Sequence, residues 1–422
     1  MHCPDIAIKT TATPPVSPMS DYAGFADAAW RRAGEIDAWF AKRFGDTAPF
    51  FYNSVDVRRA GFKIAPVDTN LFPGGFNNLS EGGRKRAAAA AACYMSKYYP
   101  KVRRLLILAE SHTRNRYYLE NVRVLQEIVS ASGVEARVAT LHSCETGEAA
   151  DEETESGETL HVDAFMEKDG RAVSADGNFI ADAVLLNNDL SGGVPEWVER
   201  LLVPVFPSPQ YGWHRRRKSS HFDAYNAAAR ELCAAIDVDS WAISPLHRKC
   251  GAVDFSSPDG VACIARNADA LLHRIQKKYD EYGIKDEPFV FIKADSGTYG
   301  MGMMTATSGE EIFGLSRKAR KKMTSIKEGR ANDEVIIQEG VPSLDLEGDA
   351  AAEPMVYLIG GTPVGAMLRY NPRKNARENL NASGMMFKRE AADDPLWPAT
   401  ACVARLASYA SAWECYNENY AI

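Results

Sequence analysis

A lysine followed at once by a glycine-rich loop is the first feature of this sequence that could perform chemistry. The segment FVFIKADSGTYGMGMMT (residues 289–305) begins with an apolar strand pattern that ends at Lys293. The lysine would bring a positive charge to phosphate oxygens, and the small residues Gly297, Gly300 and Gly302 would let backbone N–H groups approach them. Because the lysine precedes the glycines, the pattern fits neither a P-loop nor a dinucleotide fingerprint. It favours a glycine-rich flap over a nucleotide, with an ordinary hairpin as the alternative.

A second segment, EVIIQEGV (residues 334–341), is an apolar strand pattern with a polar end. It finishes in Gln338 and Glu339, followed by a glycine. In a nucleotide pocket, backbone groups here could bind the adenine edge, and the carboxylate could accept hydrogen bonds from ribose hydroxyls. Taken alone, the segment is a buried strand with a polar end, so its functional meaning depends on its neighbours.

A third segment, VGAMLRYNPRKNARENLNASGM (residues 364–385), combines cations with amide and carboxylate oxygens. A strand pattern presents Arg369, and Arg377, Asn379 and Asn381 follow before a glycine. Arginine can stabilise the charge of a transferring phosphoryl group, and Mg²⁺ prefers oxygen ligands. The alternative is a solvated loop after an edge strand.

Residues 54–80, SVDVRRAGFKIAPVDTNLFPGGFNNLS, form an unusual stretch near the N-terminus. It is dense in Arg, Asp, Asn, Pro and Gly and has little clear periodicity. We expect a loop, because binding residues are often carried on loops with many directional polar groups. A long structural loop whose Asn and Asp side chains satisfy turns is the alternative.

The elements around these segments indicate an α/β fold. Apolar strand patterns at residues 104–110, 135–141 and 183–190 alternate with helical patterns such as residues 117–132, which is typical of a parallel sheet. Ligand-binding groups gather at the carboxyl ends of such strands, so residues 110–115 and 187–191 are expected on one rim. The acidic residues 145–158 are expected to form an exposed loop.

The second half of the chain has a different pattern. Two further strands, PMVYLIGG and PVGAMLRY, are expected to join at a tight turn at Gly360 and Gly361, and a helix is expected at residues 400–413. Pro204, Pro207 and Pro209 suggest a boundary near residue 208. We therefore expect a flexible tail (residues 1–20), a first domain (21–208) and a second domain (209–422).

Bulk composition excludes several classes of protein. The net charge of −7 gives no electrostatic reason to expect a nucleic-acid partner. No apolar run is long enough to cross a membrane, and residues 1–20 lack the apolar core of a signal peptide. The eight cysteines contain no CxxC pair, which argues against a zinc site and indicates the reduced thiols of a cytoplasmic protein. Nothing in the sequence indicates an oligomeric state.

The order of the three segments resembles the ATP-grasp superfamily, and more closely its proteobacterial glutamate–cysteine ligase family. The phrases that carry the resemblance are SVDVRRAGFKIAPVDTNLFPGGFNNL, AESHTRN, LLNNDLSGG, GWHRRRKSSHF, FIKADSGTYGMGMMT, EVIIQEGV, AEPMVYLI and RENLNASGM. They run from about residue 51 to residue 387. The resemblance implies a Rossmann-like pre-ATP-grasp domain followed by an ATP-grasp domain. It also implies a ligase that uses ATP and Mg²⁺ to join glutamate to cysteine through an acyl phosphate.

The resemblance also implies a role for each candidate residue. Lys218 and Lys293 would bind phosphates, and Lys293 would act with Arg369 and Arg377 during phosphoryl transfer. The adenosine pocket would be lined by Gln338, Glu339 and Val341. The metal candidates are Glu353, Asn379 and Asn381. The residues expected to recognise the amino acids are Arg58, Arg59, Lys63, Asp68, Asn70, Asn77, Asn78, Arg114 and Asn115.

The chain departs from the superfamily pattern in its metal ligands. Many ATP-grasp ligases carry an acidic pair and an asparagine on a late strand, whereas this chain has only scattered acids after Gly384. Two alternatives therefore stay open. One is an ATP-grasp ligase for another amino acid or peptide, and the other is a non-catalytic ATP-binding regulator.

Overall fold

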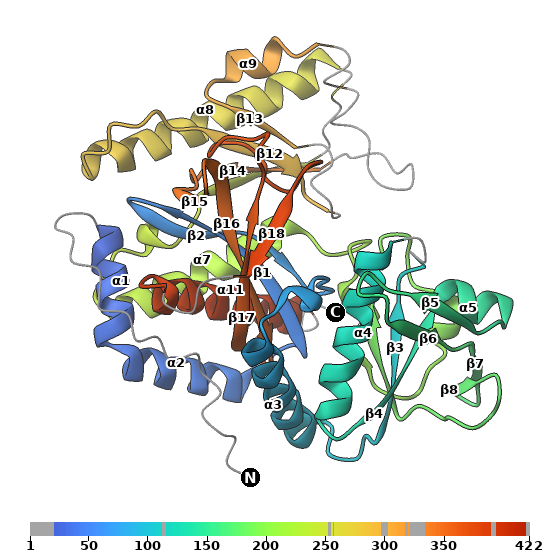
Figure 1. The fold of residues 1–422 in the computed structure, drawn as a ribbon. Coiled ribbons are helices and arrows are strands. Elements are labelled where there is room, and N and C mark those ends of the chain that lie inside the picture. The colour runs from blue at the N-terminus through green and yellow to red at the C-terminus, as the bar shows by residue number, and fades with distance from the viewer. Residues whose placement is uncertain are drawn as a thin grey trace.

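A six-stranded antiparallel sheet forms the centre of the molecule (Figure 1). The computed structural model describes residues 21–111, 115–251, 255, 257–296, 303–316, 320, 334–389 and 394–418. The sheet order is β18-β17-β16-β1-β2, and β15 pairs with β16. Its strands are β1 (Tyr52–Ala60), β2 (Lys63–Asn70), β15 (Asp345–Glu347), β16 (Ala350–Ile359), β17 (Thr362–Tyr370) and β18 (Met386–Arg389). Strands from the two ends of the sequence thus share one sheet, which crosses the boundary expected near residue 208.

The prediction of a loop at residues 54–80 is wrong for its first half. Residues 52–70 form the β1–β2 hairpin, in which Tyr52 to Ala60 are all buried except the partly buried Asp56. Val55 and Val57 pack into a core with the helices on one face, whereas Asp56 and Arg58 point to the opposite face. Because both faces are covered, the alternation of polar and apolar residues that marks a half-exposed strand is weak.

Four helices cover one face of this sheet: α1 (Asp21–Arg31), α2 (Ala33–Asp46), α7 (Lys218–Ala235) and α11 (Trp397–Glu418) (Figure 1). Helix α11 contains the helix expected at residues 400–413. The expected tight turn between β16 and β17 is confirmed. Gly360 and Gly361 have φ angles of 57° and 75°, which residues with a side chain rarely adopt.

The three expected parallel strands form a separate sheet together with β10, which was not predicted, in the order β10-β9-β3-β4. Its strands are β3 (Arg104–Ala109), β4 (Glu135–Thr140), β9 (Ala183–Asn187) and β10 (Val205–Phe206). Around it lie α3 (Glu81–Tyr98), α4 (Arg116–Ala131), α5 (Leu141–Thr146) and α6 (Glu196–Glu199). Glu110 Oε1 accepts a hydrogen bond from Asp189 N at 3.1 Å. The residues after β3 and β9 therefore meet on one rim, as expected.

The acidic residues expected to form an exposed loop instead contribute to a hairpin. Strand β5 (Ala150–Glu153) pairs with β6 (Thr159–Val162), and β7 (Phe165–Lys168) pairs with β8 (Arg171–Ser174). The acidic side chains of β5 remain largely exposed on this two-stranded ribbon. Their exposure was predicted correctly, but the backbone pairing was not, because a ribbon at the surface needs no apolar alternation.

A third sheet, of order β11-β14-β12-β13, is antiparallel and carries the expected strand before the glycine-rich loop. Its strands are β11 (His247–Cys250), β12 (Val290–Ala294), β13 (Met304–Ala306) and β14 (Val335–Glu339). Helices α8 (Pro258–Glu281) and α9 (Gly309–Phe313) pack on it (Figure 1).

Two smaller observations bear on the composition arguments. Within the described ranges, no helix combines the length and the apolar character that crossing a membrane requires. Six described cysteines are free, whereas Cys93 is disulfide-bonded. The expectation that all cysteines are reduced is therefore wrong for Cys93.

Candidate active site

A cavity lies between the six-stranded sheet and the third sheet. Strands β1, β2, β16 and β17 contribute its charged side, and β12 and β14 contribute the other side. Its lining residues are Asp56, Arg58, Val67, Asp68, Phe291, Lys293, Met303, Gln338, Glu353, Arg369, Asn379 and Asn381. The cavity therefore gathers residues from all three of the predicted chemical segments and from residues 54–80.

Two lysines and an aspartate form a cationic corner beside the cavity, of which Lys293 and Asp68 line the cavity and Lys218 does not. Lys293, at the end of β12, is buried, and its Nζ donates to Val67 O at 2.6 Å. Lys218 Nζ donates to Asp68 Oδ1 at 2.7 Å. Burial lowers the pKa of Lys293 to about 8, although Asp68 opposes this shift. Partial burial would raise the pKa of Asp68, but Lys218 and Lys293 hold it well below its usual value.

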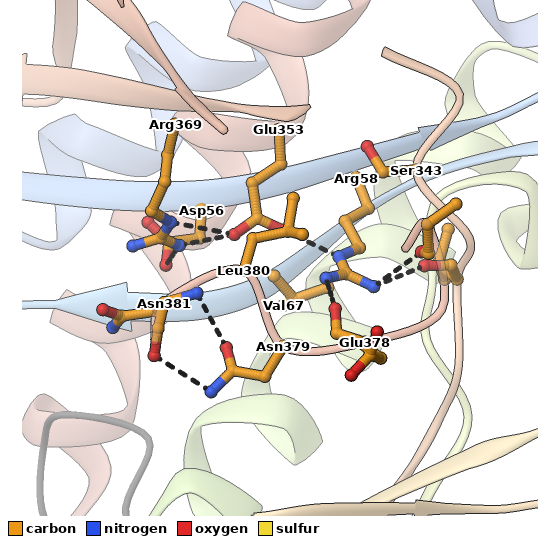
Figure 2. A network of polar contacts seen from close by, with 12 residues as sticks. Asp56, Arg58, Val67, Ser343, Glu353, Arg369, Glu378, Asn379, Leu380 and Asn381 are labelled. Atoms are coloured by element: carbon orange, nitrogen blue, oxygen red, sulfur yellow. Dashed lines mark hydrogen bonds and ion pairs between the residues drawn. The ribbon is translucent and has the colours of Figure 1, made fainter. Parts of the chain in front are cut away.

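A chain of buried ion pairs crosses the sheet beside this corner (Figure 2). Arg58 Nε donates to Glu353 Oε2 at 2.7 Å, and Arg369 Nε donates to Glu353 Oε1 at 3.0 Å. Arg369 Nη2 also contacts the carboxylate of Asp56. The residues lie on β1, β16 and β17, whose register places Glu353 opposite Arg369 and Asp56 opposite Met355. The network thus depends on strands that are far apart in the sequence.

Glu353 is fully engaged in this network, so its geometry does not support the metal role expected for it. Burial alone would raise the pKa of Glu353, but Arg58 and Arg369 hold it below its usual value. Both carboxylate oxygens accept from arginines. A metal ion would have to displace two buried guanidinium groups, which would leave charges unpaired in the interior.

Arg58 also closes the loop that follows β17. Its Nη1 donates to Val341 O at 3.2 Å and to Ala376 O at 3.3 Å, and its Nη2 donates to Glu378 O at 2.6 Å. All of its nitrogens therefore have partners, which leaves little capacity to bind the carboxylate of an amino acid as expected. Arg58 is better described as the residue that holds the loop against the cavity.

The loop held by Arg58 presents two asparagines to the cavity. Asn379 Nδ2 donates to Asn381 O at 3.1 Å, and Asn381 N donates to Asn379 Oδ1 at 3.0 Å (Figure 2). These two bonds occupy the amide of Asn379. The side chain of Asn381 makes no hydrogen bond with a described residue, so its amide is available to a ligand.

Strand alternation separates Gln338 from Glu339. Gln338 lines the cavity, and although it is buried its Nε2 donates to no described residue. An orphaned buried amide beside a cavity fits a polar ligand such as an adenine ring, because an unpaired buried donor is costly. Glu339 points away from the cavity, and its Oε2 accepts from Lys63 Nζ at 2.7 Å. The cavity therefore includes neither Lys63 nor Glu339, both of which were expected to bind ligands.

Several other expected residues have structural partners instead. Arg59 pairs with Asp345 and Asp394, and Arg377 contacts Glu287 at the surface. Asn115 caps α4 by accepting from Tyr118 N, and Asn70 accepts from Phe72 N. None of these, nor Val341, Asn77 or Asn78, belongs to the cavity lining. Gly297, Gly300, Gly302 and Arg114 lie outside the described residues.

Three lining residues of the sheets, Asp56, Val67 and Phe291, were not predicted from the sequence. The signal that could have found Asp56 is its position two residues before Arg58, because alternate residues of a strand point to the same face. Because the segment was predicted to be a loop, this strand alternation was not considered.

The described part of the chain contains no group of three or more His, Cys, Asp or Glu side chains that could hold a metal ion. The cavity instead contains cations and amides, which suit phosphate oxygens and polar rings. A divalent ion here would need oxygen ligands from the nucleotide as well as from the protein.

Comparisons with known proteins agree with this geometry. A family profile described as glutamate–cysteine ligase matches residues 27–414. A comparison with curated proteins gives no match.

Among solved structures, a provisionally named gamma-glutamylcysteine synthetase from Methylobacillus flagellatus is 37% identical, with a TM-score of 0.87. The match covers 97% of this chain and 100% of that chain. A glutathione synthetase-like effector from Globodera pallida is 10% identical (TM-score 0.40), with coverage of 87% of this chain and 83% of that chain. A D-alanyl-alanine synthetase from Vibrio cholerae is also 10% identical (TM-score 0.27), with coverage of 57% and 60%. These last two scores are too low to establish a shared fold.

Proposed function

Because this chain belongs to the glutamate–cysteine ligase family, we propose that the cavity between its two antiparallel sheets is where ATP activates glutamate for that reaction. The enzyme joins the γ-carboxylate of L-glutamate to the amine of L-cysteine. The product is γ-glutamylcysteine, and the reaction is the first step of glutathione synthesis.

The chemistry requires two transfers at one carbonyl carbon. A γ-carboxylate oxygen of glutamate attacks the terminal phosphorus of ATP, ADP leaves, and a γ-glutamyl phosphate forms. The cysteine nitrogen then attacks the acyl carbon, and the C–O bond to phosphate breaks. Positioning and charge neutralisation supply most of the catalysis in such steps. No covalent enzyme nucleophile is needed.

Lys293 and Lys218 are the proposed phosphate-binding residues. Lys218 Nζ is 2.7 Å from Asp68 Oδ1, and a phosphate oxygen could take the place of this carboxylate beside the lysine. Arg369 completes the set of cations, because it lines the cavity and its Nη1 has no partner among the described residues. The adenine ring would lie near Gln338, whose Nε2 lacks a partner.

Mg²⁺ would neutralise the charge of the phosphates when it is bound. Asn381, whose side-chain amide has no partner among the described residues, is the lining residue best able to contribute an oxygen to it, and the nucleotide would supply further oxygens. Since the reaction consumes ATP, we also propose a cytoplasmic location.

The proposal extends to the architecture. The four-stranded parallel sheet with its helices supports a Rossmann-like pre-ATP-grasp unit within residues 21–208. The antiparallel sheet with α8 and α9 supports an ATP-grasp unit within residues 209–422. The β1–β2 hairpin would then belong to the first unit by sequence, but it would complete the six-stranded sheet formed by strands of the second unit.

The observation that carries the proposal is the meeting of Lys293, Gln338 and Arg369 in one cavity. The test is to incubate the purified chain with ATP, Mg²⁺ and a panel of acids and amines, and to measure ADP together with the ligated product. We expect both only when glutamate and cysteine are present together.

Two results would contradict this expectation in different ways. Product with a different acid or amine, and none with glutamate and cysteine, would assign another ligase reaction. Tight ATP binding without ADP release from any pair would indicate a regulator.

A further inference from the structure

Cysteine brings a proton that the ligation step must remove. Its amine is largely an ammonium group at neutral pH, and an ammonium has no lone pair with which to attack the acyl phosphate. A group in the cavity that accepts that proton next to the attacking nitrogen would accelerate the step. Carboxylates are suitable acceptors when their surroundings bring their pKa closer to the working pH. Three carboxylates line the cavity: Asp56, Asp68 and Glu353.

Two of the three are already committed to cations. Glu353 accepts from Arg58 through one oxygen and from Arg369 through the other. Asp68 accepts a hydrogen bond from Lys218, and both Lys218 and Lys293 lower the pKa of its carboxyl group. A proton on either carboxylate would leave buried or clustered cations without their counter-charge.

Asp56 differs from both in its contacts. Its Oδ2 contacts Arg369, whereas its Oδ1 has no hydrogen-bond partner among the residues that the structure describes. Its side chain is 14% exposed and lines the cavity. One oxygen is therefore fixed by the arginine and the other is open to a ligand.

We propose that Asp56 is a catalytic residue that binds the ammonium group of the amine substrate through Oδ1 and takes its first proton. This inference rests on the ligase reaction proposed above. The deprotonated nitrogen then forms the C–N bond as the C–O bond to phosphate breaks. The second proton lost by the nitrogen goes to the departing phosphate, and Asp56 returns its proton to solvent.

The electrostatic surroundings of Asp56 agree with this role. Burial raises the pKa of Asp56, and the neighbouring Glu353 and Asp68 raise it further, while Arg369 opposes the shift. The other facing groups are Lys293 on β12 and Tyr357 on β16. Asp56 is thus a stronger base than an exposed aspartate.

The test compares two amines that differ in their need for a base. Hydroxylamine is largely uncharged at neutral pH, so it can trap the γ-glutamyl phosphate as a hydroxamate without giving up a proton first. We expect Asp56→Asn to lower kcat/KM for cysteine by about 100-fold or more at neutral pH, with hydroxamate formation nearly unchanged. The loss should shrink as the pH rises, because the uncharged fraction of cysteine amine increases about tenfold per pH unit below its pKa.

The controls distinguish a specific loss of the cysteine reaction from a general loss of activity. Because both products are measured in one preparation, their ratio does not depend on the amount of folded protein. Asp56→Glu should restore part of the cysteine reaction. Asp345→Asn, which removes a partly buried carboxylate from the same sheet outside the cavity, should leave the ratio unchanged. An equal loss of both products in Asp56→Asn, or no loss, would overturn the role of Asp56. A wild-type chain that makes neither product would instead refute the ligase function, and the role of Asp56 with it.

Discussion

Lys293 shows how burial changes the chemistry of a common residue. The side chain is buried at a strand end, and its ammonium donates a hydrogen bond to Val67 O at 2.6 Å. Burial lowers its pKa to about 8. The residue therefore has a positive charge at neutral pH but loses it much earlier than an exposed lysine does.

We expect kcat/KM for ATP to fall as the pH rises above about 8, because the free enzyme loses the Lys293 cation there. Lys293→Arg retains a charge that does not titrate, so any activity it keeps should lack this decline. Lys293→Ala should have no measurable turnover. Lys85→Ala, which removes an exposed lysine far from the cavity, is the matched control. The measurement is steady-state ADP release across about pH 6 to pH 10, and thermal unfolding checks that each variant is folded. A Lys293→Ala enzyme with normal turnover would exclude a role of Lys293 in phosphate binding.

Two arginines that the sequence suggested as catalytic have different surroundings. Arg369 is buried in the cavity between Glu353 and Asp56, whereas Arg377 contacts Glu287 at the surface. We expect Arg369→Ala to lower kcat by about 100-fold or more, and Arg377→Ala to have little effect. Parallel measurement of kcat in the two variants checks this. A larger loss in Arg377→Ala would mean that the loop carrying it moves to the cavity when substrates bind.

At the scale of elements, a buried ion pair joins two sheets. Lys63 on β2 and Glu339 on β14 have fully buried side chains, with Nζ and Oε2 2.7 Å apart. Lys63 also donates to Ser244 O at 3.0 Å and lies 4.1 Å from the centre of the Trp241 ring. The pair fixes the third sheet against the hairpin and so defines one border of the cavity.

We expect Lys63→Met alone to lower the free energy of unfolding by about 3–5 kcal/mol, because Glu339 would be left as an unpaired buried charge. The double variant Lys63→Met with Glu339→Gln should recover much of this loss, since the glutamine can still accept from Leu246 N. Urea unfolding of the four proteins in the double-mutant cycle measures the coupling. Additive effects would show that the two side chains do not interact.

Element prediction succeeded where burial follows a simple pattern. Strands β3, β4 and β9 of the parallel sheet, β12, β14 and the β16–β17 hairpin are all apolar runs, and all were predicted, whereas the two-residue strand β10 was not. The β1–β2 hairpin was not, because its charged residues are neutralised by partners such as Glu353, Asp345 and Glu339. Those partners are hundreds of residues away, and no local pattern reveals them.

The same reason limits prediction of the cavity. Lys293, Gln338 and Arg369 were identified from strand patterns and Asn381 from the polar segment after a strand, and all four line the cavity. Arg59, Lys63 and Glu339 have equally suitable chemistry but point away from it. Which face a charged residue occupies depends on register and on distant ion pairs, so residue type and spacing could not separate these two groups.

At the scale of the whole molecule, the six-stranded sheet combines both ends of the chain. Strand β1 has backbone pairing with β16, and its Arg58 is bonded to Glu353 and to the loop after β17. A division at residue 208 would cut this sheet into two pieces, each with an exposed strand edge and unpaired buried charges.

We therefore expect separate fragments 21–208 and 209–422 to unfold without a cooperative transition, whereas the full chain unfolds cooperatively. Co-expression of the two should yield a stable complex, because the pairing of β1 with β16 needs no covalent link. Thermal unfolding monitored by circular dichroism, with size-exclusion chromatography of the mixture, measures both effects. Cooperative unfolding of fragment 209–422 alone would show that the hairpin is dispensable.

The position of the β1–β2 hairpin also has a consequence during synthesis. Residues 71–349 must be translated before β16 can pair with β1, which takes roughly 15–60 s at typical rates of elongation. Throughout that time the nascent hairpin has an open strand edge near the ribosome. Arg58, Arg59 and Lys63 are then hydrated, and charged side chains on an open edge discourage pairing with other chains. The charges that later lie inside the protein thus protect the unfinished chain from aggregation until its partner strands emerge.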